Sequence, residues 1–180
     1  MSFVSLFSNL QELKFSYIKK SSTSAYFSEL QYVAFPKLQT LKISHNYPKL
    51  DYMMKFLEIN GENLEEIYID EEDNNLKLFI AKFCPNLKKL YLKFDDGELD
   101  ILKTIFNGCQ YLESIKILCG SLSVKEVLQS VAKYSPKSFY ELKLHKDSFS
   151  SLCSKELEFF FISWKNRTPM RSITQSNYFK

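Results

Sequence analysis

A short apolar spacing recurs six times along the sequence. In each copy two apolar residues are three positions apart and a third follows two positions later, as at Leu87, Leu90 and Leu92. The copies begin at Leu10, Leu38, Leu64, Leu87, Leu112 and Phe139. Alternate side chains of an extended chain share a face, so the second and third apolar residues of each copy point to the same side. The spacing therefore predicts six short strands, each with one buried face.

Between these segments the apolar period lengthens to three or four residues, which is typical of a helix with one buried face. Turn residues such as Asn60-Gly61 and Pro85-Asn86 follow the helical stripes. The stripes are Leu50, Met53, Met54 and Leu57; Leu76, Phe79, Ile80 and Phe83; Leu99, Leu102, Ile105 or Phe106, and Cys109; and Val124, Val127, Leu128 and Val131. The first apolar residues of successive copies are 23 to 28 residues apart. Alternation of strand and helix with a repeat of this length is the signature of a leucine-rich repeat. We therefore predict an α/β leucine-rich-repeat solenoid of the ribonuclease-inhibitor type, with about six repeats, a parallel sheet on the concave face and helices on the convex face.

Length and composition are those of one globular domain spanning residues 1–180, with no internal boundary. We expect a monomer in which residues 154–180 form a C-terminal cap and tail, with Leu157, Phe160, Phe161 and Trp164 on the buried side of a helix. The net charge is only +3 and the lysines alternate with acidic residues, so no nucleic-acid or membrane footprint is predicted. No apolar run is long enough to span a bilayer. The first residues lack a signal-peptide pattern, so we expect a cytoplasmic or nuclear protein.

The sequence gives little support for an enzyme or for a bound cofactor or metal. Phosphate-binding, zinc-protease and serine-hydrolase motifs are absent, and none of the four cysteines lies in a zinc-binding spacing. Cys84 and Cys109 each lie three residues before the first leucine of a repeat, which predicts buried structural thiols. Cys119 with His145 is the strongest catalytic alternative, on neighbouring repeats. The acidic run at residues 70–73 is typical of a solvated face and lacks the pattern of a calcium loop.

Two junctions resemble those of F-box/leucine-rich-repeat proteins. Phe83-Cys84-Pro85-Asn86-Leu87-Lys88-Lys89-Leu90 is similar to their C-P-x-L-x-x-L junction, and Gly108-Cys109-Gln110-Tyr111-Leu112 is similar to G-C-x-x-L. Longer runs, such as residues 81–87, 131–137 and 160–169, resemble the C-terminal halves of a fungal F-box family. The resemblance implies a substrate receptor of an SCF ubiquitin ligase, in which the repeats hold the protein to be ubiquitinated. No F-box pattern is recognisable here, so a Skp-type adaptor is expected as a partner only if the full-length protein contains one.

Two other functions use the same architecture. A free-standing scaffold or decoy would bind a protein with no link to ubiquitin. A GTPase activator of similar fold would need polar groups after its strands, often an arginine, whereas this sequence has no arginine before Arg167.

The strand phase also predicts where a protein partner binds. The residue between the second and third apolar positions points out of the concave face in every repeat, which gives a column of residues: Lys14, Lys42, Tyr68, Tyr91, Lys116 and Lys143. Lys93 lies beside this column. Exposed tyrosines supply contact area at low entropic cost, and lysines attract acidic segments. We therefore predict a protein-binding site formed by Lys42, Tyr68, Tyr91, Lys93, Lys116 and Lys143, although such lysines also serve solubility alone.

Overall fold

The computed structural model of the chain describes residues 7–16, 27–44, 48–70, 73–95, 97–119, 122–146, 154–167 and 169–177. This part of the chain contains a seven-stranded sheet whose strands follow one another in chain order. The strands are β1 (Glu12–Ser16), β2 (Thr40–Ser44), β3 (Glu66–Ile69), β4 (Lys89–Phe94), β5 (Ser114–Cys119), β6 (Glu141–Lys146) and β7 (Ser172–Asn177). The helices are α2 (Leu50–Asn60), the 3₁₀ helix η2 (Gly61–Asn63), α3 (Asn74–Phe83), α4 (Leu99–Gly108), α5 (Val124–Tyr134) and α6 (Ser154–Trp164).

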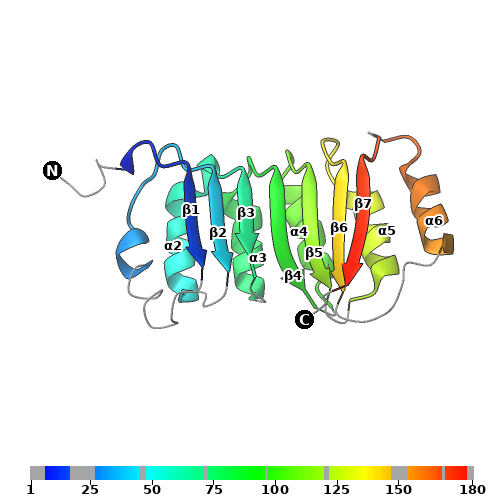
Figure 1. Ribbon diagram of the computed structural model, residues 1–180, viewed down its shortest axis with the longest axis horizontal. Coiled ribbons are helices and arrows are strands. Elements are labelled where there is room, and N and C mark those ends of the chain that lie inside the picture. The colour runs from blue at the N-terminus through cyan, green and yellow to red at the C-terminus, as the bar shows by residue number, and fades with distance from the viewer. Residues whose placement is uncertain are drawn as a thin grey trace.

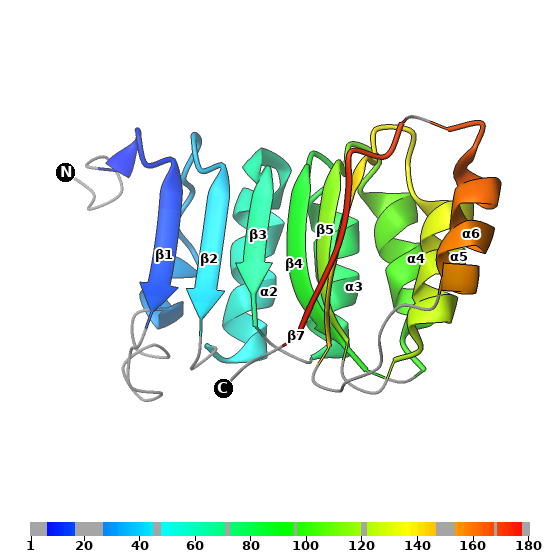
Figure 2. The same ribbon diagram turned by 45° about the vertical axis from the view of Figure 1, so that its right-hand side comes forward.

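Every neighbouring pair of strands is parallel. Figure 1 shows helices α2 to α5 stacked behind the sheet, and Figure 2 shows the same arrangement turned by 45°. The predicted α/β architecture, a parallel sheet alternating with helices, is thus confirmed. We call the other side of the sheet, which these helices leave uncovered, the helix-free face.

The core lies between the sheet and the helices. The second and third apolar residues of the predicted repeats fill it: in β4, Leu90 is 2% exposed and Leu92 is fully buried. The first apolar residues Leu38, Leu64, Leu87, Leu112 and Phe139 are also fully buried. Leu10, Leu13 and Phe15 of the first copy are only partly buried. The predicted phase of the strands is therefore correct.

The backbone repeats the same hydrogen bonds at each copy. The N–H of every first apolar residue donates to the carbonyl oxygen three residues earlier, at 3.0 to 3.3 Å, as Leu87 does to Cys84. Just before each strand, one carbonyl oxygen accepts two N–H groups from the next copy. These carbonyls belong to Gln11, Gln39, Glu65, Lys88, Glu113 and Tyr140, and the bonds measure 2.8 to 3.4 Å. The copies are therefore equivalent in backbone structure as well as in sequence.

The C-terminal part of the chain differs from the predicted cap and tail, because residues Ser172–Asn177 form a seventh strand. β7 pairs with β6 over its whole length, with Ile173 beside Leu142 and Gln175 beside Leu144. Met170, Ile173 and Gln175 have the spacing of the six predicted copies, and Met170 and Ile173 pack against the core. A glutamine in the third position removed the apolar signal, so the sequence pattern missed this strand.

Helix α6 packs against α5 at the β7 end of the molecule (Figure 2). Phe160 and Trp164 are buried as predicted, but Phe161 is 52% exposed. The prediction was wrong for Phe161 because consecutive helical residues are about 100° apart, and this helix buries only a narrow stripe. Arg167 secures the end of α6: its guanidinium lies 4.4 Å from the Trp164 ring and donates hydrogen bonds to the carbonyls of Ala132, Ser135 and Pro136.

A buried ion pair joins α3 to the start of α4, and the sequence pattern did not predict it. Lys77 is 1% exposed, and its Nζ lies 2.5 Å from Glu98 Oε2. The ammonium also contacts Asn74 Oδ1 at 3.1 Å and lies 5.0 Å from the centre of the Phe94 ring. Glu98 in turn accepts a hydrogen bond from the backbone N–H of Asp95 at 3.0 Å. Each charge is therefore compensated inside the protein.

Two further contacts hold successive layers together. The fully buried Asn60 side chain accepts from the N–H of Phe35 and donates to the carbonyls of Val33 and Phe56, so all its hydrogen-bonding atoms are used. Gly108 approaches the preceding layer so closely that a Cβ atom there would lie 2.0 Å from the Ala81 carbonyl oxygen. Only glycine fits at that position without a shift of the backbone.

Candidate protein-binding face

The predicted column lies in register across the helix-free face. Parallel pairing places Lys14, Lys42, Tyr68, Tyr91, Lys116, Lys143 and, in the unpredicted seventh strand, Thr174 side by side. Two residues further along the strands, on the same face, Lys93, Leu118 and His145 lie side by side. Equivalent residues of parallel strands are neighbours, so this arrangement follows directly from the repeat spacing.

The centre of the face is an aromatic and cationic cluster. The rings of Tyr68 and Tyr91 stack with their centroids 4.0 Å apart and their planes 11° apart. The ammonium of Lys116 lies 4.7 Å from the centre of the Tyr91 ring and 5.9 Å from that of Tyr68. These neighbours leave Tyr91 only 4% exposed, while Tyr68 is half-buried. The expected pair of exposed tyrosines is therefore corrected, because Tyr91 is covered by its own neighbours.

Positive charge accumulates around this cluster. Burial, followed by the nearby charge of Lys143, lowers the pKa of the Lys116 ammonium, and the Asp70 carboxylate acts in the opposite direction. Burial and the charge of Lys116 also lower the pKa of His145. In both cases burial is the larger cause and the charge of a neighbouring lysine the second, so the cationic side chains on this part of the face are close enough to repel one another.

Most other charges on or beside this face are paired along or between strands. Lys42 Nζ lies 2.9 Å from Glu12 Oε1, and Lys89 Nζ lies 2.6 Å from Glu66 Oε1. Lys143 Nζ lies 2.8 Å from Glu141 Oε2, which also accepts a hydrogen bond from Ser114 Oγ at 2.6 Å. These two hydrogen bonds lower the pKa of the Glu141 carboxyl, that from Lys143 being the larger cause. By contrast, Lys116 has no carboxylate within ion-pair distance among the described residues.

The catalytic alternative loses its geometric basis. Cys119 alternates with Ile117 on the core side and is fully buried, whereas His145 pairs with Leu118 on the helix-free face. Their side chains thus leave the sheet on opposite sides. Burial raises the pKa of the Cys109 thiol to about 12, and burial with the nearby Cys109 raises that of Cys84 well above its usual value. Both thiols are protonated packing groups, as predicted, while Cys153 lies outside the described residues.

The described residues form no cluster of His, Cys, Asp and Glu suited to a metal ion. Of the acidic run, Asp73 caps α3 by accepting from the N–H groups of Asn75 and Leu76, and Glu71 and Glu72 lie outside the described residues. None of the helices in the described ranges combines the length and apolar character of a transmembrane span.

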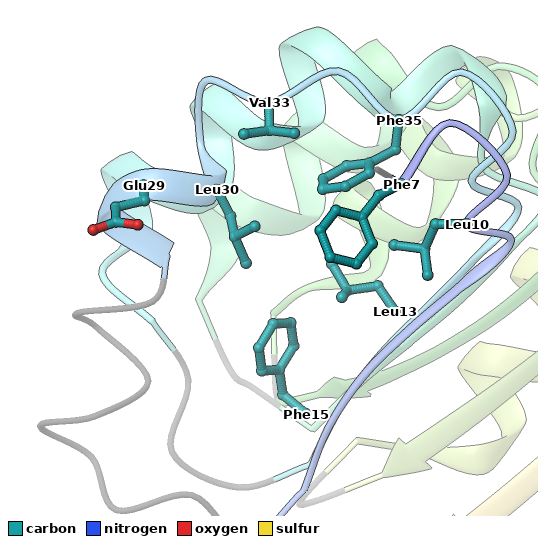
Figure 3. Close-up of a pocket in the computed structure, with 8 residues that line it drawn as sticks. All are labelled: Phe7, Leu10, Leu13, Phe15, Glu29, Leu30, Val33 and Phe35. Carbon is teal, nitrogen blue, oxygen red and sulfur yellow. The ribbon is translucent and has the colours of Figure 1, made fainter. Parts of the chain in front are cut away.

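An apolar pocket of about 420 Å³ lies at the other end of the sheet, beside β1. Figure 3 shows seven apolar side chains around it and Glu29 at its edge. The lining residues are Phe7, Leu10, Leu13, Phe15, Glu29, Leu30, Val33 and Phe35. No expectation from the sequence placed a site there, and the pocket offers no pair of polar groups to orient a ligand.

His145 provides a test of the electrostatics of the face. In a His45→Gln background, where it is the sole histidine, we expect an NMR titration to give a pKa below 6.5, and Lys116→Gln to raise it. Because the pKa of His145 is lower in the folded chain, this side chain binds a proton more readily in the unfolded chain. The contribution of His145 to stability is therefore present above pH 6.5 and is lost as the pH falls toward the folded-state pKa. A pKa at or above 6.5, or one unaffected by Lys116→Gln, would contradict this description.

A scan of protein-family models finds no match to this sequence, and a search of curated proteins finds no significant similarity.

Proposed function

We propose that the chain is a leucine-rich-repeat module that binds a protein partner through the helix-free face of its sheet. The observation that carries the proposal is the registered column from Lys42 to Lys143, with the Tyr68, Tyr91 and Lys116 cluster at its centre. A sheet face that no helix covers and that combines aromatic and charged residues is suited to a protein interface.

The strand order supports the repeat assignment over a nucleotide-binding α/β fold. A doubly wound sheet reverses its strand order and has helices on both faces, and ligands bind at the reversal. Here the order runs from β1 to β7 without reversal, and α2 to α5 lie on one side (Figure 1). The recurring turn and carbonyl hydrogen bonds fit a solenoid in which each unit contacts its neighbours.

The junction motifs favour one particular role, that of the substrate-recognition part of an SCF ubiquitin ligase. Cys84 and Cys109, which carry the resemblance, are buried at equivalent positions before Leu87 and Leu112. Co-purification of the full-length protein with a Skp-type adaptor would test this role. A free-standing scaffold or decoy is the alternative, and it predicts partner binding without the adaptor.

The binding proposal is tested by removing two lysine charges from the helix-free face and, as a control, two from elsewhere on the surface. In pull-downs from extracts of the source cells, we expect Lys42→Ala combined with Lys143→Ala to recover at least ten-fold less partner than the wild type, a loss of about 1.4 kcal/mol. The matched control removes two exposed charges elsewhere, Lys125→Ala in α5 with Lys165→Ala after α6. Equal recovery by the two folded double variants would contradict the proposal.

A further inference from the structure

The most unusual charge on the helix-free face is that of Lys116. Its ammonium lies over the Tyr68 and Tyr91 rings, at 5.9 and 4.7 Å from their centres. The contacts of the ammonium with the ring faces are cation–π interactions, which attract the charge without neutralising it. The side chain is therefore positioned while its charge remains available.

The other lysines nearby differ in this respect. Lys42, Lys89 and Lys143 each lie within 3 Å of a glutamate oxygen. Any partner that pairs with one of them must compete with that glutamate. Within the described ranges Lys116 has no such competitor, since its favourable electrostatic partner, Asp70, forms no ion pair with it.

The surroundings of Lys116 favour an incoming negative charge. Lys143 follows it in the column, and His145 lies diagonally on the same face. Half-burial of Lys116 reduces its contact with water, which strengthens its interaction with an opposite charge. Burial is the main cause that lowers the pKa of the Lys116 ammonium, and the charge of Lys143 is the second, so two cations lie close together at this point of the face.

Tyr68 and Tyr91 differ from the aromatic residues that dominate many interfaces, whose rings insert into a pocket of the partner. Tyr91 is nearly buried, and one face of its ring is occupied by Tyr68. A partner therefore cannot enclose this ring without breaking the stack. The pair instead forms a rigid support that fixes the position of Lys116.

We propose that the bound partner contributes an acidic peptide segment, and that one of its Asp or Glu carboxylates pairs with the ammonium of Lys116 above the Tyr68–Tyr91 stack. This inference rests on the proposed protein-binding function. It adds the chemical class of the partner segment and the residue that selects it.

The test uses a defined peptide rather than an unknown protein. The ¹⁵N-labelled chain is titrated at low ionic strength with a soluble peptide containing four consecutive glutamates, and with the same peptide carrying glutamines. NMR detects binding in the millimolar range. We expect shifts that saturate at the helix-free face with the glutamate peptide, at least ten-fold tighter binding than with the glutamine peptide, and a rise in the pKa of Lys116 on binding.

Three variants decide the role of Lys116. Lys116→Met keeps an unbranched side chain over the rings and is expected to abolish the preference for glutamate, whereas Lys116→Arg is expected to retain it. Lys125→Met, on helix α5, makes the same substitution away from the face and should behave as the wild type.

Several results would overturn the inference. They are equal affinity for the two peptides, no binding of the glutamate peptide in the millimolar range, or an unchanged preference in folded Lys116→Met. If the Lys42 and Lys143 double variant loses its partner in pull-downs while Lys116→Met retains it, the protein-binding function stands and the acidic-segment inference fails.

Discussion

Replacing Leu90 with aspartate is expected to unfold the chain. Leu90 is 2% exposed in the central strand β4, between Ile67 of β3 and Ile115 of β5. An unpaired carboxylate buried there costs several kcal/mol, which is comparable with the total stability of about 5 to 15 kcal/mol typical of a domain. We expect far-ultraviolet circular dichroism of Leu90→Asp to show no cooperative thermal transition.

Leu78 supplies the matched control for this substitution. It lies on α3 and is 41% exposed, so Leu78→Asp makes the same chemical change where water can solvate the charge. Its melting curve should resemble that of the wild type. A soluble Leu90→Asp protein with a wild-type melting curve would contradict the repeat packing described for the core.

Glu98→Ala is expected to have the second-largest effect. The substitution leaves Lys77 charged and 1% exposed with only Asn74 Oδ1 and the Phe94 ring for compensation. Removing one member of a buried ion pair typically costs about 3 to 5 kcal/mol, because the other charge stays buried without its partner. The free energy of unfolding in urea measures this loss.

Two comparisons separate the buried charge from the loss of a contact. In Lys77→Met combined with Glu98→Leu no charge is left unpaired, so we expect most of the stability to return. Glu58→Ala breaks the surface pair with Lys55, which has a similar distance of 2.7 Å but lies exposed, and should cause no measurable loss. If the double variant were as unstable as Glu98→Ala, the argument from the unpaired charge would be wrong.

The sequence predicts the strands and their register well because one physical rule determines both. Alternation fixes which residues of each strand are buried, and parallel pairing then places equivalent residues side by side. From Leu90 and Leu92 in one copy and the equivalent Ile115 and Ile117 in the next, it follows that Tyr91 and Lys116 are neighbours across β4 and β5.

The seventh strand could not be found in this way, since its pattern has a polar residue in a decisive position. Gln175 occupies the third apolar place, so residues 154–180 were predicted to form only a C-terminal cap and tail. Pairing with β6 supplies backbone hydrogen bonds that do not depend on side-chain polarity. Such a strand forms because a neighbouring strand edge is available.

The repeat pattern also did not predict which side chains contact one another. Periodicity placed Tyr91 on the helix-free face but gave no indication that Tyr68 and Lys116 cover it. Lys77 lies outside the apolar stripe predicted for its helix, yet its ammonium reaches Glu98 inside the protein. Both outcomes depend on contacts between residues more than 20 positions apart, and a repeat spacing carries no information about them.

Photo-crosslinking tests the binding face most directly. A photoreactive phenylalanine analogue is placed at position 44 or 174 on the helix-free face, beside Lys42 and Lys143, or at position 125 on α5, and each protein is irradiated with the extract or purified partner. The account predicts a crosslinked product of one size from positions 44 and 174 and none from position 125. Crosslinking from position 125 alone would contradict it and place the interface on the helices.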